Sequence, residues 1–178
     1  MRIPRGRQAL LAIAAAALGL PAAGCGYRLA GQGRFLPADI HTIAVAPFDN
    51  ITSRSEIEDR ITEQLVEELD RRGEIRTTTP DKPADARLTG TVTAYTTLPV
   101  TFTGAGKASR VQVTVQARVS LTDLRTGAVI WRQDHFVFRA DYDVSKDQAT
   151  YFDQEILAID LIARDCARTI ATSLLEGF

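Results

Sequence analysis

Hydrophobic and polar residues alternate with a period of two over three long segments of the chain. In the clearest, from Val111 to Thr122, every odd position is Val, Ala or Leu and every even position is Gln, Thr, Arg or Ser. Leu88 to Tyr95 and Ala128 to about Tyr142 alternate less strictly. This period predicts strands with one buried and one polar face. Asp123 to Gly127 predicts a tight turn, so we expect an antiparallel meander.

Two other segments have the period of an amphipathic helix. The first places an apolar residue at every fourth position, at Ile57, Ile61, Leu65 and Leu69. Ser53 or Ser55 is placed to cap it, Glu56 or Glu58 to complete a capping box, and Gly73 to end it. The second begins near Thr150 and runs nearly to the C-terminus. Its apolar stripe comprises Ile156, Ile159, Ala163, Cys166, Ala167, Ile170 and Leu174.

The segment from His41 to Phe48 is apolar on both faces, which predicts a strand well inside a sheet, ended by Pro47. We expect Thr77 to Ala86 to be a connection. The order strand, helix, three strands, helix predicts an α+β fold with two helices packed on one face of a four-stranded, mostly antiparallel sheet. The polar face of Thr89 to Thr122 then meets either water, as an ordinary solvated face, or a polar partner.

The N-terminus has the layout of a cleaved secretory signal. Arg2, Arg5 and Arg7 precede Ala9 to Leu20, which has no charge and is shorter than the ~20 residues of a membrane span. The residues before Cys25 resemble the bacterial lipobox, although that pattern favours Leu at the position of Ala22. We expect a lipoprotein signal peptide at 1–24, an acylated Cys25 with a tether over 25–40, and one domain over 41–178. An ordinary signal with a chance cysteine is the alternative.

Charge and cysteine content exclude several classes of function. Three of the 21 basic residues and none of the 22 acidic ones precede Cys25, so the mature chain has a formal charge of −4. This charge argues against nucleic-acid binding, which needs a basic face. Acylation of Cys25 leaves Cys166 without a disulfide partner. Helical spacing predicts Cys166 as a small buried side chain, with a reactive thiol as the alternative.

We expect no enzyme activity, no metal and no cofactor other than the covalent lipid. His41 lies at a strand start and His135 within a strand, and neither belongs to a nucleophile elbow, a metal-ligand spacing or a phosphate loop. We interpret His135 as a half-buried strand residue.

Several motifs in order resemble the LPS-assembly lipoprotein family, LptE. They are "CGYRL" at 25–29, "IAVAPFDN" at 43–50, "EIEDRITEQLVEEL" at 56–69, "ADARLTGTVTAY" at 84–95, "VIW" at 129–131, and the closing helix. The resemblance implies a Gram-negative lipoprotein that plugs the LptD β-barrel and helps to place lipopolysaccharide (LPS) in the outer leaflet. It also implies anchorage at the outer membrane, on the periplasmic side. Gly26 favours this membrane, because Asp after the acylated cysteine tends to hold such proteins at the inner one.

In the resembled family, basic side chains in two loops contact LPS. The corresponding loops here are Pro99 to Arg110, which offers Lys107 and Arg110, and the loop before the last helix, which offers Lys146. Each can pair with lipid A phosphates, and each can equally be an ordinary exposed residue. The rival class is another envelope assembly lipoprotein, of the curli-secretion or penicillin-binding-protein-activator type, whose opening resembles residues 43–50 and the acidic helix.

Overall fold

The computed structural model describes residues 36–144 and 148–177. All of them belong to the second of two units, Met1–Gln32 and Gly33–Phe178. The predicted signal peptide, Cys25 and Lys146 lie outside the described residues, as do the side chains of residues 148–153.

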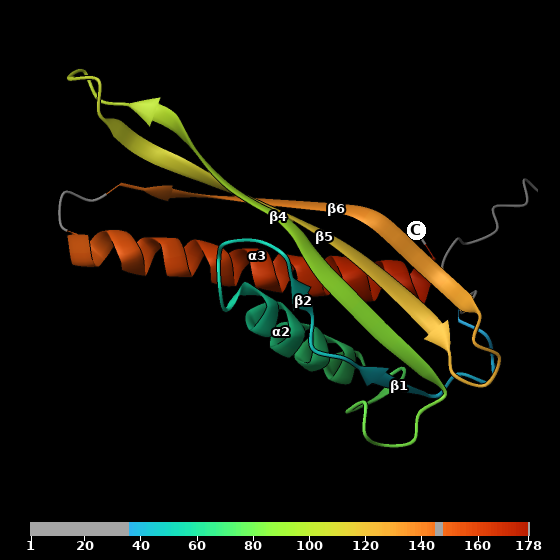
Figure 1. Cartoon of the computed structure of the whole chain (residues 1–178). Coiled ribbons are helices and arrows are strands. Elements are labelled where there is room, and N and C mark those ends of the chain that lie inside the picture. The colour runs from blue at the N-terminus through green and yellow to red at the C-terminus, as the bar shows by residue number, and fades with distance from the viewer. Residues whose placement is uncertain (1–35, 145–147, 178) are drawn as a thin grey trace, which may run out of the picture. The chain divides into compact units, whose positions relative to one another are not determined.

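Two helices and a mixed sheet of six strands form the described domain (Figure 1). The helices are α2 (Ile57–Arg72) and α3 (Gln148–Glu176). The strands are β1 (Thr42–Val45), β2 (Asp49–Asn50), β3 (Arg76–Thr78), β4 (Ala86–Phe102), β5 (Ala108–Asp123) and β6 (Val129–Asp143). The sheet order is β3-β1-β4-β5-β6, and β2 pairs with β4.

The predicted antiparallel meander is confirmed. β5 pairs antiparallel with β4 on one side and with β6 on the other. The predicted turn between β5 and β6 is also confirmed, because the Asp123 carboxylate accepts hydrogen bonds from the backbone N–H groups of Arg125 (2.7 Å) and Thr126 (3.1 Å). Gly127 ends this turn with a φ of 73°, a conformation that favours glycine.

The prediction of a four-stranded, mostly antiparallel sheet is wrong in the number of strands. It is also wrong in the direction of pairing for β1, β2 and β3. β1 is parallel to both β3 and β4, and β2 is parallel to β4. Two strands were not predicted from the sequence, β2 with two residues and β3 with three. β3 contains only Arg76, Thr77 and Thr78, which carry no alternation. It forms because α2 returns the chain beside β1 as a parallel crossover.

One hydrophobic core joins the helices to a single face of the sheet, as predicted. α2 contributes Ile57, Ile61, Leu65 and Leu69, all at most 1% exposed. The odd-numbered side chains of β5 from Val111 to Leu121 are buried against them and against α3. On β6, Trp131, Phe136 and Phe138 form an aromatic row, with ring centroids 6.2 and 5.9 Å apart. Both helices therefore cover the same face, and the opposite face is free of them (Figure 1).

The ends of the helices match the predictions only in part. Gly73 ends α2 with a φ of 69°, as predicted. The predicted serine cap is wrong, because Glu56 is the N-cap residue and makes no side-chain capping bond. Asn50 organises this loop instead, and its Nδ2 donates to the Arg54 carbonyl (2.7 Å) and to the Glu58 carboxylate (2.6 Å). Ile156, predicted in the buried stripe of α3, is 37% exposed.

The start of β1 is held to β4 by Asp85. The backbone N–H groups of His41 and Thr42 donate to its carboxylate at 2.9 and 2.8 Å. These two bonds stabilise the ionised form and lower the pKa of Asp85 below its usual value. The parallel half of the sheet thus depends on an ionised carboxylate.

We expect Asp85→Asn to reduce the pH dependence of stability in acid. Because the pKa of Asp85 is lower in the folded state, its contribution is fully present above the ordinary Asp pKa of ~3.9 and is lost as the pH falls through the folded pKa. Urea unfolding should therefore show Asp85→Asn less stable than wild type at pH 7, with the difference shrinking as the pH falls below ~3.9. Asp59→Asn, on the exposed side of α2, is the control. If the difference in unfolding free energy between wild type and Asp85→Asn were the same at neutral and acid pH, the ionised Asp85 carboxylate would not be its source.

Candidate binding surface

The sheet face opposite the helices is the candidate binding surface. On β5 the even-numbered residues from Gln112 to Thr122 point to this side, because their odd-numbered neighbours are buried. Cross-strand partners share a face, so Thr89 and Thr91 of β4, opposite Ser120 and Arg118, lie on it too. The hydroxyls of Thr89 and Ser120 are 3.0 Å apart. The predicted polar face is therefore present, and within the domain no helix covers it.

The β4–β5 hairpin continues beyond the part of the sheet that packs on the helices, toward the upper left of Figure 1. From Thr96 to Lys107 every residue is exposed. The turn is closed by a hydrogen bond from the Thr103 N–H to the Lys107 carbonyl (2.7 Å), and Gly106 has a φ of 75°. The region predicted as a loop from Pro99 to Arg110 is thus mostly strand, with only five residues between β4 and β5.

The three predicted basic residues have different surroundings. Lys107 is exposed at the hairpin turn, and among the described residues no acidic group pairs with it. Arg110 lies in β5, where its Nε donates to the Asp143 carboxylate at 2.9 Å, a bond that raises the pKa of Arg110. Lys146 lies outside the described residues. Lys107 is the candidate whose charge is available, whereas that of Arg110 is compensated.

Sequence reasoning missed an apolar group at the same tip. Leu98 is 61% exposed, Val100 43% and Phe102 60%, all on β4 within the hairpin extension. Their spacing of two residues was the available sequence signal, but a register shift between Val92 and Ala94 places Leu98 opposite Gln112, on the outer face. Large exposed apolar side chains that gather in one place mark interaction sites. The tip therefore combines an apolar group with the ammonium of Lys107.

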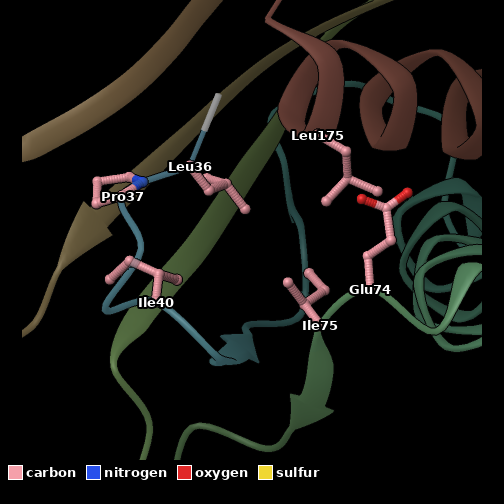
Figure 2. A pocket seen from close by; sticks show the side chains of 6 residues that line it. All are labelled: Leu36, Pro37, Ile40, Glu74, Ile75 and Leu175. Carbon is pink, nitrogen blue, oxygen red and sulfur yellow. The ribbon is translucent and has the colours of Figure 1, made fainter. Parts of the chain in front are cut away.

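One hollow lies where Leu175 of α3 meets the segment before β1 and the start of β3. Leu36, Pro37, Ile40, Glu74, Ile75 and Leu175 surround a hollow of about 10 Å³, shown in Figure 2. This is room for about one water molecule, so the hollow is a packing gap and not a ligand pocket. Residues 36–144 and 148–177 contain no group of three His, Cys, Asp or Glu side chains placed to hold a metal ion. The candidate site is therefore the outer sheet face and not this hollow.

Neither described helix is long and apolar enough to cross a membrane. Cys166 is fully buried in α3, and burial raises the pKa of its thiol above the ordinary range. The prediction of a small buried side chain is confirmed. The thiol is not a candidate nucleophile, because the reactive form of cysteine is the thiolate.

Solved structures with the same arrangement of elements define the class of the domain. A protein from Xanthomonas campestris aligns with a TM-score of 0.57 and 13% identity, over 78% of this chain and 85% of its own. Lipoprotein B from Nitrosomonas europaea gives 0.52 and 8%, over 79% and 88%. A candidate lipoprotein from Caulobacter crescentus gives 0.52 and 16%, over 72% and 87%. At these identities the likeness establishes the fold alone, a two-layer α+β domain also found in bacterial lipoproteins.

The family follows from the sequence. Residues 40–174 match the LptE family, described as lipopolysaccharide-assembly, and the chain belongs to this family. No curated protein matches the chain. Membership confirms the resemblance and makes the chain an envelope lipoprotein of the LPS-assembly type, in a family that is not catalytic.

Proposed function

We propose that this protein is an outer-membrane lipoprotein that plugs an LptD-type β-barrel and assists the insertion of LPS into the outer leaflet. The observation that carries the proposal is the family match over residues 40–174, combined with a sheet face that is polar and uncovered. The lumen of a large outer-membrane barrel is polar and water-filled. A domain that turns Thr, Gln, Ser and Arg side chains outward is suited to occupy it.

The lipid attachment belongs to the same proposal. The signal peptide 1–24 is removed, Cys25 becomes the acylated N-terminus, and residues 25–40 connect it to the domain of residues 41–178. Each buried acyl methylene contributes ~0.8 kcal/mol, so more than one chain makes attachment stable. The lipid holds the domain at the periplasmic side of the outer membrane. The protein acts by binding and not by catalysis, and needs no cofactor beyond this lipid.

The β4–β5 hairpin tip is the proposed LPS contact. Lys107 supplies a positive charge for lipid A phosphates, while Leu98, Val100 and Phe102 offer apolar surface to the acyl chains next to them. Lys146 in the loop before α3 is the second proposed cation. Arg110 contributes less, because it is already paired with Asp143.

Copurification tests the proposal directly. The full-length lipoprotein, tagged at its C-terminus and extracted from membranes in detergent, is expected to bring down a large β-barrel protein identified by mass spectrometry. Recovery of a peptidoglycan synthase or a curli-secretion component, and no barrel, would favour the rival class of envelope lipoprotein and overturn the proposed function.

Reversing the charge of both proposed cations is expected to weaken LPS binding. Lys107→Glu with Lys146→Glu places acids near the lipid A phosphates and should lower the affinity for intact LPS by roughly tenfold, since each charge-assisted contact is worth more than a neutral one. The measurement is titration of the detergent-solubilised lipoprotein with LPS. Lys82→Glu, in the exposed β3–β4 connection, is the control. Equal affinity of the double variant and wild type would exclude the tip as the contact.

A further inference from the structure

Three arginines on the outer sheet face have no acidic partner. Ion pairs hold the other two arginines of β5 and β6, Arg110 with Asp143 at 2.9 Å and Arg132 with Asp134 at 2.7 Å. By contrast, the side chains of Arg87, Arg118 and Arg139 are exposed and make no hydrogen bond or ion pair with any described residue. The face therefore carries three guanidinium groups whose charge no described acidic side chain compensates.

Strand register places the three arginines in one diagonal row. Arg87 of β4 lies opposite Thr122 of β5, and Arg139 of β6 lies opposite Thr114 of β5. Thr122, Arg118 and Thr114 are all on the outer face of β5, four residues apart. At ~3.3 Å per residue, the arginines recur about every 13 Å along β5 and shift by one strand at each step. The row crosses β4, β5 and β6 over roughly 27 Å.

The side chains between the arginines are short, polar and mostly uncharged. Thr91, Thr114, Gln116 and Ser120 occupy the intervening outer positions of β4 and β5, and offer hydroxyl and amide groups that both donate and accept hydrogen bonds. The outer positions of this row include no Phe, Tyr or Trp, and their large exposed apolar side chains are Val129, opposite Thr122, and Val137, opposite Gln116, at 56% and 42% exposure. Protein interfaces draw most of their affinity from aromatic and other anchors in pockets. This face instead combines guanidinium groups, which bind anions through two hydrogen bonds, with hydroxyl and amide groups that can bond to sugar hydroxyls.

We infer that the row of Arg87, Arg118 and Arg139 binds the anionic sugar portion of LPS. This inference rests on the proposed function and adds a second contact, distinct from the hairpin tip. Each guanidinium can hold a phosphate or carboxylate through two parallel hydrogen bonds, and the hydroxyl and amide groups between them contact neutral sugar hydroxyls. The extended, shallow row suits an oligosaccharide lying along the face, while the apolar tip takes the acyl chains.

The test removes the charges of the row and keeps its polarity. The variant Arg87→Gln/Arg118→Gln/Arg139→Gln is compared with Arg76→Gln/Arg164→Gln/Lys82→Gln, which loses the same charge at exposed positions of β3, α3 and the β3–β4 connection. Neither set includes a described ion-pair partner. The full-length lipoprotein in detergent is titrated with deacylated LPS, which keeps the phosphorylated sugars and lacks the acyl chains. Thermal unfolding by circular dichroism confirms that both variants are folded.

We expect the row variant to bind deacylated LPS about tenfold or more weakly than wild type, and the control variant to change by less than about twofold. The affinity of the row variant for deacylated LPS should also depend less on salt concentration than the affinity of wild type. Equal affinity of wild type and row variant for deacylated LPS would overturn the inference. If that equality is accompanied by loss of barrel copurification, the face docks on the barrel instead of on sugar.

The failure of the inference is distinguishable from failure of the proposed function. A wild-type protein that binds intact LPS and the barrel but not deacylated LPS overturns the sugar contact alone. A wild-type protein that binds neither form of LPS and recovers no barrel overturns both.

Discussion

Replacing Gly90 with alanine is expected to destabilise the domain by about 1–3 kcal/mol and to lower its melting temperature by roughly 4–10 °C. A Cβ atom added to Gly90 would lie 2.2 Å from the ring of Phe48, well inside van der Waals contact. The ring is 4% exposed and belongs to the core, so it has little room to move. The loss is a large part of the 5–15 kcal/mol by which ordinary domains are stable. Thermal and urea unfolding measure it.

Two further variants identify the cause. Gly104→Ala, in the hairpin turn, meets no atom within 4 Å and should leave the melting temperature unchanged. Phe48→Leu is expected to destabilise wild type, yet to cost less when Gly90 is already alanine, because the smaller side chain relieves the overlap. The steric explanation would be contradicted if the losses of unfolding free energy from Phe48→Leu and Gly90→Ala simply added in the double variant. It would also be contradicted if Gly90→Ala were as stable as wild type.

Replacing Cys25 with serine is expected to release the protein from the membrane. A serine hydroxyl does not receive the thioether-linked lipid that the proposal assigns to Cys25, so the anchoring energy of the acyl chains is lost. Cells fed with labelled palmitate should yield labelled wild-type protein and unlabelled Cys25→Ser. Fractionation should move the variant from the membrane pellet to the soluble envelope fraction.

Cys166→Ser is the matched control, since it removes the other cysteine of the chain. Cys166 is fully buried in α3 and should accept no lipid, so this variant is expected to stay labelled and membrane-bound. Its cost should be confined to stability, because a hydroxyl replaces a thiol in the core. Palmitate label on Cys25→Ser, or its loss from Cys166→Ser, would refute the assignment of the anchor to Cys25.

Much of the fold was predictable because burial here follows local periodicity. The odd positions of β5 and the four-residue row of α2 are buried as their patterns predicted. Gly73 and the turn after Asp123 are also local signals, and both are confirmed. β3 was not predictable, because three residues without a pattern pair only when α2 brings them beside β1.

The candidate site was predictable in kind but not in arrangement. The polar face followed from the alternation, and Lys107 from the resemblance to the family. The pairing of Arg110 with Asp143 and the exposure of Phe102 depend on where β4 and β5 end, and these ends lie beyond the limits that the sequence predicted. The roles of Cys25, Lys107 and Lys146 stay predictions for the experiments above.

By itself, the sequence determined which side of α2 and of β5 is buried, that two helices accompany a meander, and that the opposite face is polar. These features depend on periods of two and of about four residues, which the backbone geometry of a single strand or helix imposes. Tertiary structure alone decided the parallel pairing of β1, the ring of Phe48 over Gly90 and the alignment of Arg87, Arg118 and Arg139. Each joins residues far apart in the chain, so register between strands, and not any local pattern, brings them together.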